Sequence, residues 1–468
     1  MKNINIIYFS TVSFLYVVVL CVLSLILFRG YSNPFDIALH QVFWTFFFFM
    51  GAHYFNNYWK NINEKGLIYS LFGFSLLFNI FSVFWYYYIY MAYTGTPFEA
   101  LYSDQMFYDE QGENLSYYIL DGDYFPRELF KGDFSDFGYP YFLGVIYAIF
   151  GQDIFIVRLI QALLSSITVV FVYKIARSFF NSEISKIAGI LMMLSPILIR
   201  FTTTHLKETV MLFFIVLGTY NAILFLKTKN LRYVKFMIAF FSFLCLLTFR
   251  TVTSLIFVFS FFLYFVYQPN IKNSIYRYLG IPVFILVFVY ALLSSPADEE
   301  ISDSINKGAG YSESVLKVSS SKSLSKVTNF PVNMSFAIFG PFPNMLDKLP
   351  LEPDRMFFQQ LISADTMIKS VLGFFLILGL YYVFRMGFRK NIFLLSIILL
   401  NITLVAFTGV MLNLRHYLPF YPFILIFVSV GIYYFSQQQK RYYIYYLIIL
   451  LCITIFFNFL KLSDFDLI

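Results

Sequence analysis

The chain has 468 residues, of which 59% are hydrophobic and only 13% are charged. Soluble globular domains carry about 45–50% apolar and about 25% charged residues, so this composition excludes an ordinary soluble domain and indicates a membrane protein. The formal net charge of +7 does not imply nucleic-acid binding, because a membrane protein concentrates lysine and arginine in its cytoplasmic loops.

Runs of about 20 apolar residues, the length that crosses the hydrocarbon core as a helix, recur along the chain. Backbone groups in lipid must be hydrogen-bonded internally, so each run is expected to be a helix. The sequence predicts about thirteen spans, near residues 6–28, 37–56, 67–92, 154–178, 186–203, 207–227, 233–250, 252–268, 276–295, 366–385, 391–411, 416–436 and 441–460. The expected fold is an all-α polytopic membrane protein with a single membrane-embedded domain over residues 1–468. The first run is too long for a typical signal-peptide core, which predicts a span there.

Lysine and arginine alternate between the predicted loops. With the N-terminus in the cytoplasm, every basic cluster falls in a cytoplasmic segment, as the positive-inside rule requires. These clusters are Lys60 and Lys65; Lys174, Arg177 and Lys186; Lys227, Lys229, Arg232 and Lys235; Lys272 and Arg277; Arg385, Arg389 and Lys390; and Lys440 and Arg441. The alternation holds only if the apolar stretch 138–150 does not cross, so it is expected to be a short interfacial or re-entrant helix.

Two long loops then fall on the extracytoplasmic side, at 93–153 and 296–365. The second contains Phe339-Gly340-Pro341-Phe342-Pro343, where glycine and proline favour a stiff turn. This loop either covers an active cavity or reads the acceptor, or it is only a turn over the outer face.

The first long loop carries acidic residues near the predicted outer membrane surface. Asp104 follows the third span, and a carboxylate there can act as a general base toward an acceptor hydroxyl or amine. The alternative is that Asp104, Asp109 and Glu110 are solvated acids of an exposed loop.

Four cationic or titratable side chains, Lys207, Arg250, Arg415 and His416, are predicted at outer helix ends on the same side as Asp104. A lipid phosphate needs cations at headgroup level, and arginine can bind it through two hydrogen bonds. The alternative for each is that it extends toward lipid headgroups without a specific ligand.

Glu208 stands at the predicted start of a span, where it could stabilise the helix N-terminus, orient His205 or bind a divalent cation. A dedicated metal site needs several oxygen ligands, and the sequence does not assemble one. Metal binding is therefore left open.

An ordered series of motifs over about residues 100–255 resembles the GT-C superfamily of membrane glycosyltransferases. It is most similar to the branch of protein O-mannosyltransferases and the lipid A aminoarabinose transferase. That branch has an outer-loop Asp followed by a Tyr, here Asp104 and Tyr108, and then a Gly-Tyr-Pro start, here Gly138-Tyr139-Pro140. An apolar stretch ending in Phe-Gly and an Arg-Leu-x-x-Ala helix, here beginning at Arg158, follow.

Later motifs continue the resemblance. Ser195-Pro196 resembles the branch's Ser-Pro turn, and Glu208 resembles the acidic residue that opens the next span. Arg250 matches an arginine at an outer helix end. Leu414-Arg415-His416-Tyr417-Leu418-Pro419 resembles its Arg-Tyr-x-x-Pro element.

The resemblance implies inverting transfer of a sugar from a polyprenyl-phosphate-linked donor to a glycan, lipid or protein, with Asp104 as the general base. It implies a multi-pass protein of the cell's inner (plasma) membrane, in contact with membrane lipid. No cofactor is implied with certainty, and a divalent cation is possible. The candidate substrate-binding residues are Tyr108, Tyr139, Arg158, His205, Lys207, Glu208, Arg250, Arg415 and His416.

Two other functions stay open from the sequence, as does a non-catalytic scaffold of an envelope-glycan assembly. An O-antigen or capsule polymerase or ligase would share the polytopic architecture, the long outer loops and the arginines. A transporter of lipid-linked glycans belongs to another class. Transporters often place charges near the bilayer midplane, whereas the charges here gather at helix ends on one side, which favours interfacial chemistry.

Overall fold

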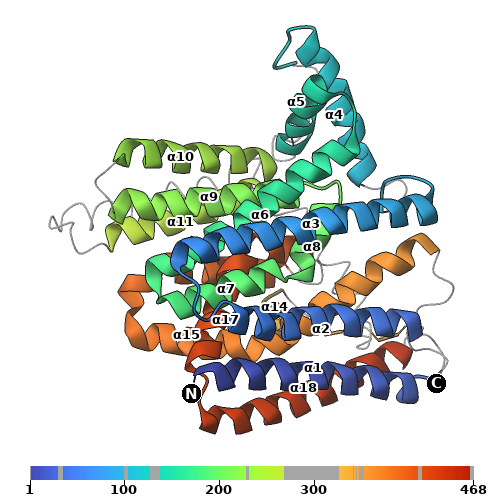
Figure 1. The fold of residues 1–468 in the computed structure, drawn as a ribbon, viewed down its shortest axis with the longest axis vertical. Helices are drawn as coiled ribbons and strands as arrows, with labels where there is room; N and C mark the ends of the chain where they lie inside the picture. Colours follow the sequence, from blue (N-terminus) through green and yellow to red (C-terminus); the bar gives the residue numbers. More distant parts are fainter. Residues whose placement is uncertain are drawn as a thin grey trace.

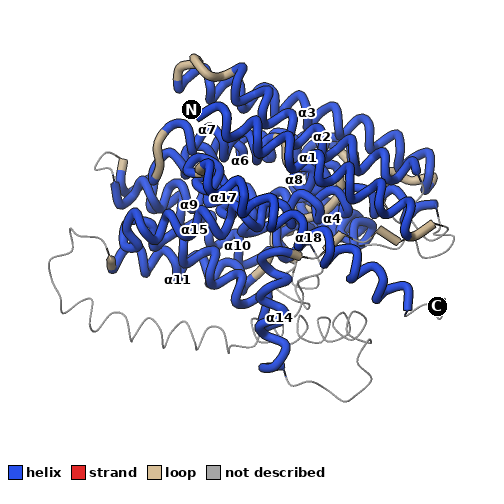
Figure 2. Tube along the Cα trace, turned by 90° about the horizontal axis from the view of Figure 1, so that it is seen from below, coloured by secondary structure: helices blue, strands red, loops and turns tan. Residues whose placement is uncertain are grey.

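The computed structural model describes residues 2–29, 35–99, 104–126, 137–227, 231–267, 326–340, 342–343, 345–346, 353–408 and 414–463. Throughout these ranges the regular structure is helical, without a β-strand, as Figure 2 shows. The predicted all-α polytopic fold is confirmed.

The long helices run back and forth, roughly parallel to one another (Figure 1). In chain order the helices are α1 (Lys2–Leu27), α2 (Phe35–Tyr58), α3 (Glu64–Thr94), α4 (Asp104–Leu120), α5 (Gly138–Phe150), α6 (Ile154–Phe179), α7 (Ser182–Met193), α8 (Pro196–Thr203), α9 (Glu208–Lys227), α10 (Arg232–Phe249), α11 (Thr251–Val266), α14 (Lys326–Phe339), α15 (Pro353–Thr408), α16 (Leu414–Tyr417), the 3-10 turn η4 (Leu418–Phe420), α17 (Tyr421–Tyr434) and α18 (Gln437–Ser463).

Eight helices in the described part of the chain are long and apolar enough to cross a membrane, or nine if α7 and α8 form one span. Helix α11 is apolar but shorter. The predicted span 276–295 lies outside the described residues. The count of about thirteen spans and the cytoplasmic N-terminus therefore stay predictions.

The run 186–203 is not one straight span. It consists of α7 and α8, which are bent by 44° at Leu194 and Ser195. Proline cannot donate a backbone hydrogen bond and disfavours a helical conformation in the residue before it, and Ser195 before Pro196 is extended with ψ 117°. The Ser-Pro turn is the physical cause of the break.

The predicted spans 366–385 and 391–411 are joined within α15 by a break at Gly387. Its φ of +124° lies outside the range of a right-handed helix and is a conformation that glycine adopts without a steric penalty. The chain therefore reverses with almost no loop. Helix α15 already begins at Pro353, so the last part of the predicted loop 296–365 is helical.

Contacts between distant segments define one end of the bundle. The Arg177 guanidinium at the end of α6 lies 3.6 Å from Glu64 at the start of α3. The Gln439 amide at the start of α18 donates a 3.0 Å hydrogen bond to the Tyr382 hydroxyl of α15. This end contains the described basic clusters that the sequence places in the cytoplasm.

At the opposite end, the Arg158 guanidinium at the start of α6 donates to the carbonyl of Pro97, which follows α3. The segment between these residues, which contains α4 and α5, therefore leaves the bundle and returns to it at the same end. Which side of a membrane this end faces stays a prediction.

Helices α4 and α5 pack side by side beside the start of α6 (Figure 1). Two glycines permit the close approach: a Cβ on Gly112 would lie 2.5 Å from Leu143, and a Cβ on Gly144 would lie 2.9 Å from Leu115. The sequence predicted a short helix at 138–150 but no helix over 104–120. Helix α4 carries many polar and acidic residues, so no long apolar run marked it in the sequence.

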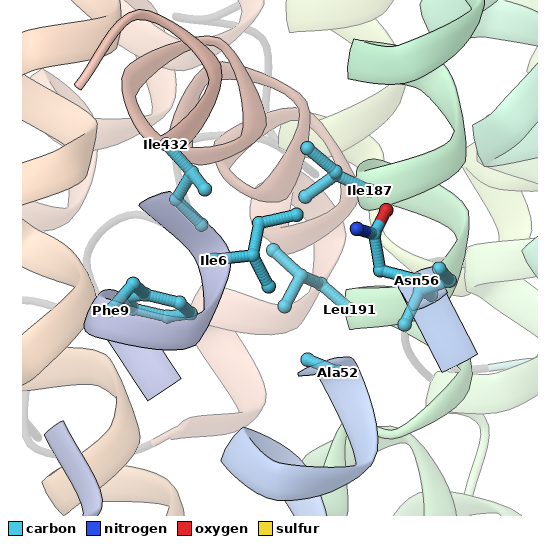
Figure 3. Close-up of a pocket in the computed structure, with 8 residues that line it drawn as sticks. Ile6, Phe9, Ala52, Asn56, Ile187, Leu191 and Ile432 are labelled. Atoms are coloured by element: carbon cyan, nitrogen blue, oxygen red, sulfur yellow. The ribbon is translucent and has the colours of Figure 1, made fainter. Parts of the chain in front are cut away.

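A small apolar void lies among α1, α2, α7 and α17, where Ile6, Ala52, Leu191 and Ile432 converge (Figure 3). Its volume of about 10 Å³ is enough for one water molecule at most. It marks where the N-terminal helix packs on the core and cannot hold a substrate.

Helices α15 and α17 cross at Gly379 and Gly431. A Cβ on Gly431 would clash with the carbonyl oxygen of Phe375, and one on Gly379 with that of Phe427. Close backbone approach through small residues is how membrane helices gain packing energy. We expect Gly431→Ala to destabilise the protein by about 1–3 kcal/mol, because the helices must separate. Gly73→Ala in α3 is the matched control, since its Cβ meets no atom within 4 Å; thermal unfolding of both variants in one detergent compares them.

Candidate active site

Arg415 joins two carboxylates that are far apart in the sequence. Its Nη1 lies 2.6 Å from Oδ2 of Asp104, the first residue of α4, and its Nε lies 2.7 Å from Oε1 of Glu208, the first residue of α9. Both are charge-assisted hydrogen bonds, and both carboxylates stand at helix N-termini, where negative charge is favoured. Three predicted site residues therefore meet at one point.

The two carboxylates differ in exposure. The Asp104 side chain is 61% exposed, Arg415 is 23% exposed, and Glu208 is fully buried. Asp104 is therefore accessible from the surface, whereas Glu208 is enclosed and contacts Arg415. The second oxygen of Glu208, Oε2, has no hydrogen-bond partner among the described groups.

Two further predicted cations surround Glu208. The charges of Arg250 and Lys207 both act on its carboxylate. The buried Lys207 ammonium also donates a 3.0 Å hydrogen bond to the Phe249 carbonyl, which ends α10 just before Arg250. His416 follows Arg415 in α16 and is partly buried. The structure thus brings Lys207, Arg250 and Arg415 together around one buried acid.

Asp109 holds α4 against the rest of the site. Its carboxylate accepts hydrogen bonds from the Tyr147 hydroxyl of α5, from the Gln152 amide at 3.2 Å, and from His205 Nε2 at 3.3 Å. Burial raises the pKa of Asp109, but these three donors outweigh it and hold that pKa below its usual value. Asp109 is therefore an ionised, nearly buried anchor, and the alternative of a solvated loop acid is wrong for this residue.

His205 is fully buried between α8 and α9. Burial lowers its pKa, and the opposing effect of Asp109 does not restore it. The imidazole is therefore neutral near pH 7 and donates its Nε2 proton to Asp109. Its contacts are with Asp109, Tyr147 and the rings of Phe98 and Tyr139, so direct substrate binding by His205 stays a prediction.

Acid should weaken this network. Unfolded histidine takes up a proton near pH 6.5, whereas folded His205 resists protonation, so its contribution to stability is complete above about pH 6.5 and is lost as the pH falls toward the lowered pKa. We expect His205→Gln to lose this acid-dependent destabilisation, so that lowering the pH from 7.5 to 5.5 should change its midpoint of thermal unfolding less unfavourably than that of wild type. His53→Gln on α2 is the control; an equal pH response in all three proteins would contradict the assignment.

Three further predicted site residues, Tyr108, Tyr139 and Arg158, are buried. The Gln161 amide bonds to the Tyr139 hydroxyl at 2.8 Å and to the Leu206 carbonyl at 3.1 Å, and the Tyr108 ring packs edge-on against Tyr139. These residues fix α4, α5 and α6 relative to the 204–207 turn. Substrate contact by these three residues stays a prediction.

Residues 137–293 match the family model of dolichyl-phosphate-mannose-protein mannosyltransferase. This match supports a membrane glycosyltransferase of the GT-C superfamily. Such an enzyme uses a lipid-linked sugar donor. The matched stretch contains six candidate residues: Tyr139, Arg158, His205, Lys207, Glu208 and Arg250. Asp104 and Arg415 lie outside it. Neither a search of curated proteins nor one of solved structures found a match.

The glycosyltransferase has a second buried ion pair that the sequence analysis missed. Glu99 Oε1 lies 3.9 Å from Arg200 Nε of α8, and its Oε2 accepts a 3.1 Å hydrogen bond from Gln105. Burial raises the pKa of Glu99 to about 7, although Arg200 and Gln105 act against it. Because Gln105 follows Asp104 directly, this pair fixes the start of α4. An arginine inside an apolar run was the signal that could have revealed it.

Helix α15 adds two more buried ionisable side chains, Asp365 and Lys369. The Lys369 Nζ lies 3.6 Å from the ring centroid of Tyr417, two residues after Arg415. Both side chains fall at the edge of a predicted span, where ionisable residues usually have a functional or pairing role. Their spacing of four residues places them on one face of α15.

No group of three or more His, Cys, Asp or Glu side chains in the described part of the glycosyltransferase is arranged to hold a metal ion. Asp104 and Glu208 are bridged by Arg415. A divalent cation stays a prediction.

Proposed function

We propose that this glycosyltransferase moves a sugar, with inversion, from a polyprenyl-phosphate-linked donor to a glycan, lipid or protein at the extracytoplasmic face of the inner (plasma) membrane. Asp104 is the proposed general base. The observation that supports this proposal is the Arg415 bridge between an exposed carboxylate and a buried one.

The exposed Asp104 carboxylate accepts the proton of an acceptor hydroxyl or amine as the acceptor atom attacks the anomeric carbon. The bond from that carbon to the phosphate oxygen breaks, and the polyprenyl phosphate leaves with the bonding electrons. A general base of this kind contributes about 10²–10⁴ in rate.

The arginine has two roles in this scheme. Its Nε bond to buried Glu208 keeps the guanidinium in place, while its Nη1 bond to Asp104 is the one that a donor phosphate can replace. After this replacement the positive guanidinium pairs with the leaving phosphate, and Asp104 is free to act as a base. Lys207 and Arg250 add positive charge near Glu208.

The family match favours a transferase over a transporter. The sequence suggests a polymerase or ligase by its outer loops and arginines alone, and no contact among the described residues favours one. The acceptor class remains to be found by experiment.

Deletion of the gene, followed by analysis of envelope glycans and polyprenyl-linked intermediates, tests the proposal. We expect one polyprenyl-phosphate sugar to accumulate and the same sugar to disappear from one glycan, lipid or protein. Wild-type protein should reverse both changes, and Asp104→Asn protein made at the same level should reverse neither. Unchanged glycans and unchanged lipid-linked sugars would contradict the proposed function.

A further inference from the structure

A pocket of about 360 Å³ opens at the end of the bundle opposite Asp104. It lies where α6 ends and α7 begins, beside the break in α15 and the end of α17. Arg177, Phe180, Met386, Lys390 and Tyr434 are among the residues that line it. A volume of this size is typical of a small-molecule site.

The pocket carries excess positive charge. Arg177 and Lys390 line it, and the Lys227 ammonium, which donates to the Ser178 carbonyl in its wall, is close enough to Lys390 for their charges to repel. The ion pair of Arg177 with Glu64 is 3.6 Å long, and both side chains are about half exposed, so water weakens it.

The neighbouring acid of α7 does not neutralise this charge, because Glu183 lies 3.0 Å from Lys186. In the part of the chain that the structure describes, no carboxylate lies within 4.0 Å of Lys390 or Lys227. Two cations at the pocket therefore lack a carboxylate partner there.

Phe180, Met386 and Tyr434 place apolar surface beside the cations, and the polar residues Ser178 and Asn181 also line the pocket. A ligand that matches both features has a phosphate and an adjoining apolar part. Basic pockets between membrane helices at the cytoplasmic side suit anionic lipid headgroups, and this end contains the basic clusters predicted to face the cytoplasm.

We propose that this pocket binds the phosphate headgroup of an anionic membrane lipid, held by Arg177 and Lys390. The bound lipid connects the end of α6, the start of α7, the break in α15 and the end of α17. These four helices also extend toward the active site. This site is separate from the sugar-transfer site and does not depend on the proposed reaction.

The test uses purified full-length protein in mild detergent and native mass spectrometry. Phosphatidylglycerol and phosphatidylcholine are added separately, and inorganic phosphate is added in a third arm. We expect wild type to retain phosphatidylglycerol in preference to phosphatidylcholine. Lys390→Gln, and separately Arg177→Gln, should weaken that retention about fivefold each. Arg441→Gln on α18 removes an exposed cation outside the pocket and should retain the lipid as wild type does.

Three results would overturn the proposal. Equal retention by wild type and both pocket variants would remove Arg177 and Lys390 from the site. An equal loss in Arg441→Gln would show attraction to diffuse surface charge alone. Retention of inorganic phosphate without phosphatidylglycerol would assign the pocket to a soluble anion. Equal unfolding temperatures in phosphatidylcholine check that the variants are folded.

Discussion

Asp104→Asn should lower the rate of sugar transfer by about a hundredfold or more, while donor binding and the unfolding temperature stay close to wild type. The amide keeps the size of the side chain and can still accept a hydrogen bond from Arg415, but it cannot take a proton from the acceptor. Because the Asp104 side chain is 61% exposed, the loss of its charge should cost little stability. Transfer of labelled sugar by purified protein measures the rate.

Glu110→Gln is the matched control for this prediction, because Glu110 is an exposed carboxylate on the same helix. It should retain full activity. Full activity of Asp104→Asn would end the assignment of Asp104 as the base, and equal loss in both variants would point to the charge of α4 as a whole.

Arg415→Ala should weaken donor binding about ten- to hundredfold, the effect of losing charge-assisted hydrogen bonds to a phosphate. It should also destabilise the protein by about 3 kcal/mol, because buried Glu208 loses the partner that lies 2.7 Å away. Equilibrium binding of the polyprenyl-phosphate sugar and thermal unfolding measure the two effects.

A double variant separates these two effects. Arg415→Ala with Glu208→Gln removes the buried charge together with its partner, so stability should largely return while donor binding stays weak. Recovery of donor binding in the double variant, or unchanged affinity in Arg415→Ala, would show that Arg415 has only a structural role.

The membrane architecture could be predicted because it depends on local composition. Long apolar runs must form helices in lipid, and a Ser-Pro turn or a glycine at positive φ interrupts them where it occurs. Helix α4 was missed because its 17 residues mix polar and apolar side chains and form no long apolar run. It packs against α5 through Gly112 and Leu115.

The site was predictable only in outline. Asp104, Glu208, Arg250 and Arg415 could be assigned to one side, because charge alternation fixes which helix ends are together. The pairing of Arg415 with both carboxylates could not be predicted, because Glu208 and Arg415 are 207 positions apart in the sequence.

The sequence by itself determined a polytopic helical protein, the expected sidedness of its loops and a resemblance to glycosyltransferases, because each of these depends on composition or on short motifs. Only the tertiary structure decided that Asp109 is a buried anchor, that His205 is enclosed, and that Glu99 pairs with Arg200. Burial and ion pairing depend on which helices pack together, and the sequence of one helix does not specify which other helix packs against it.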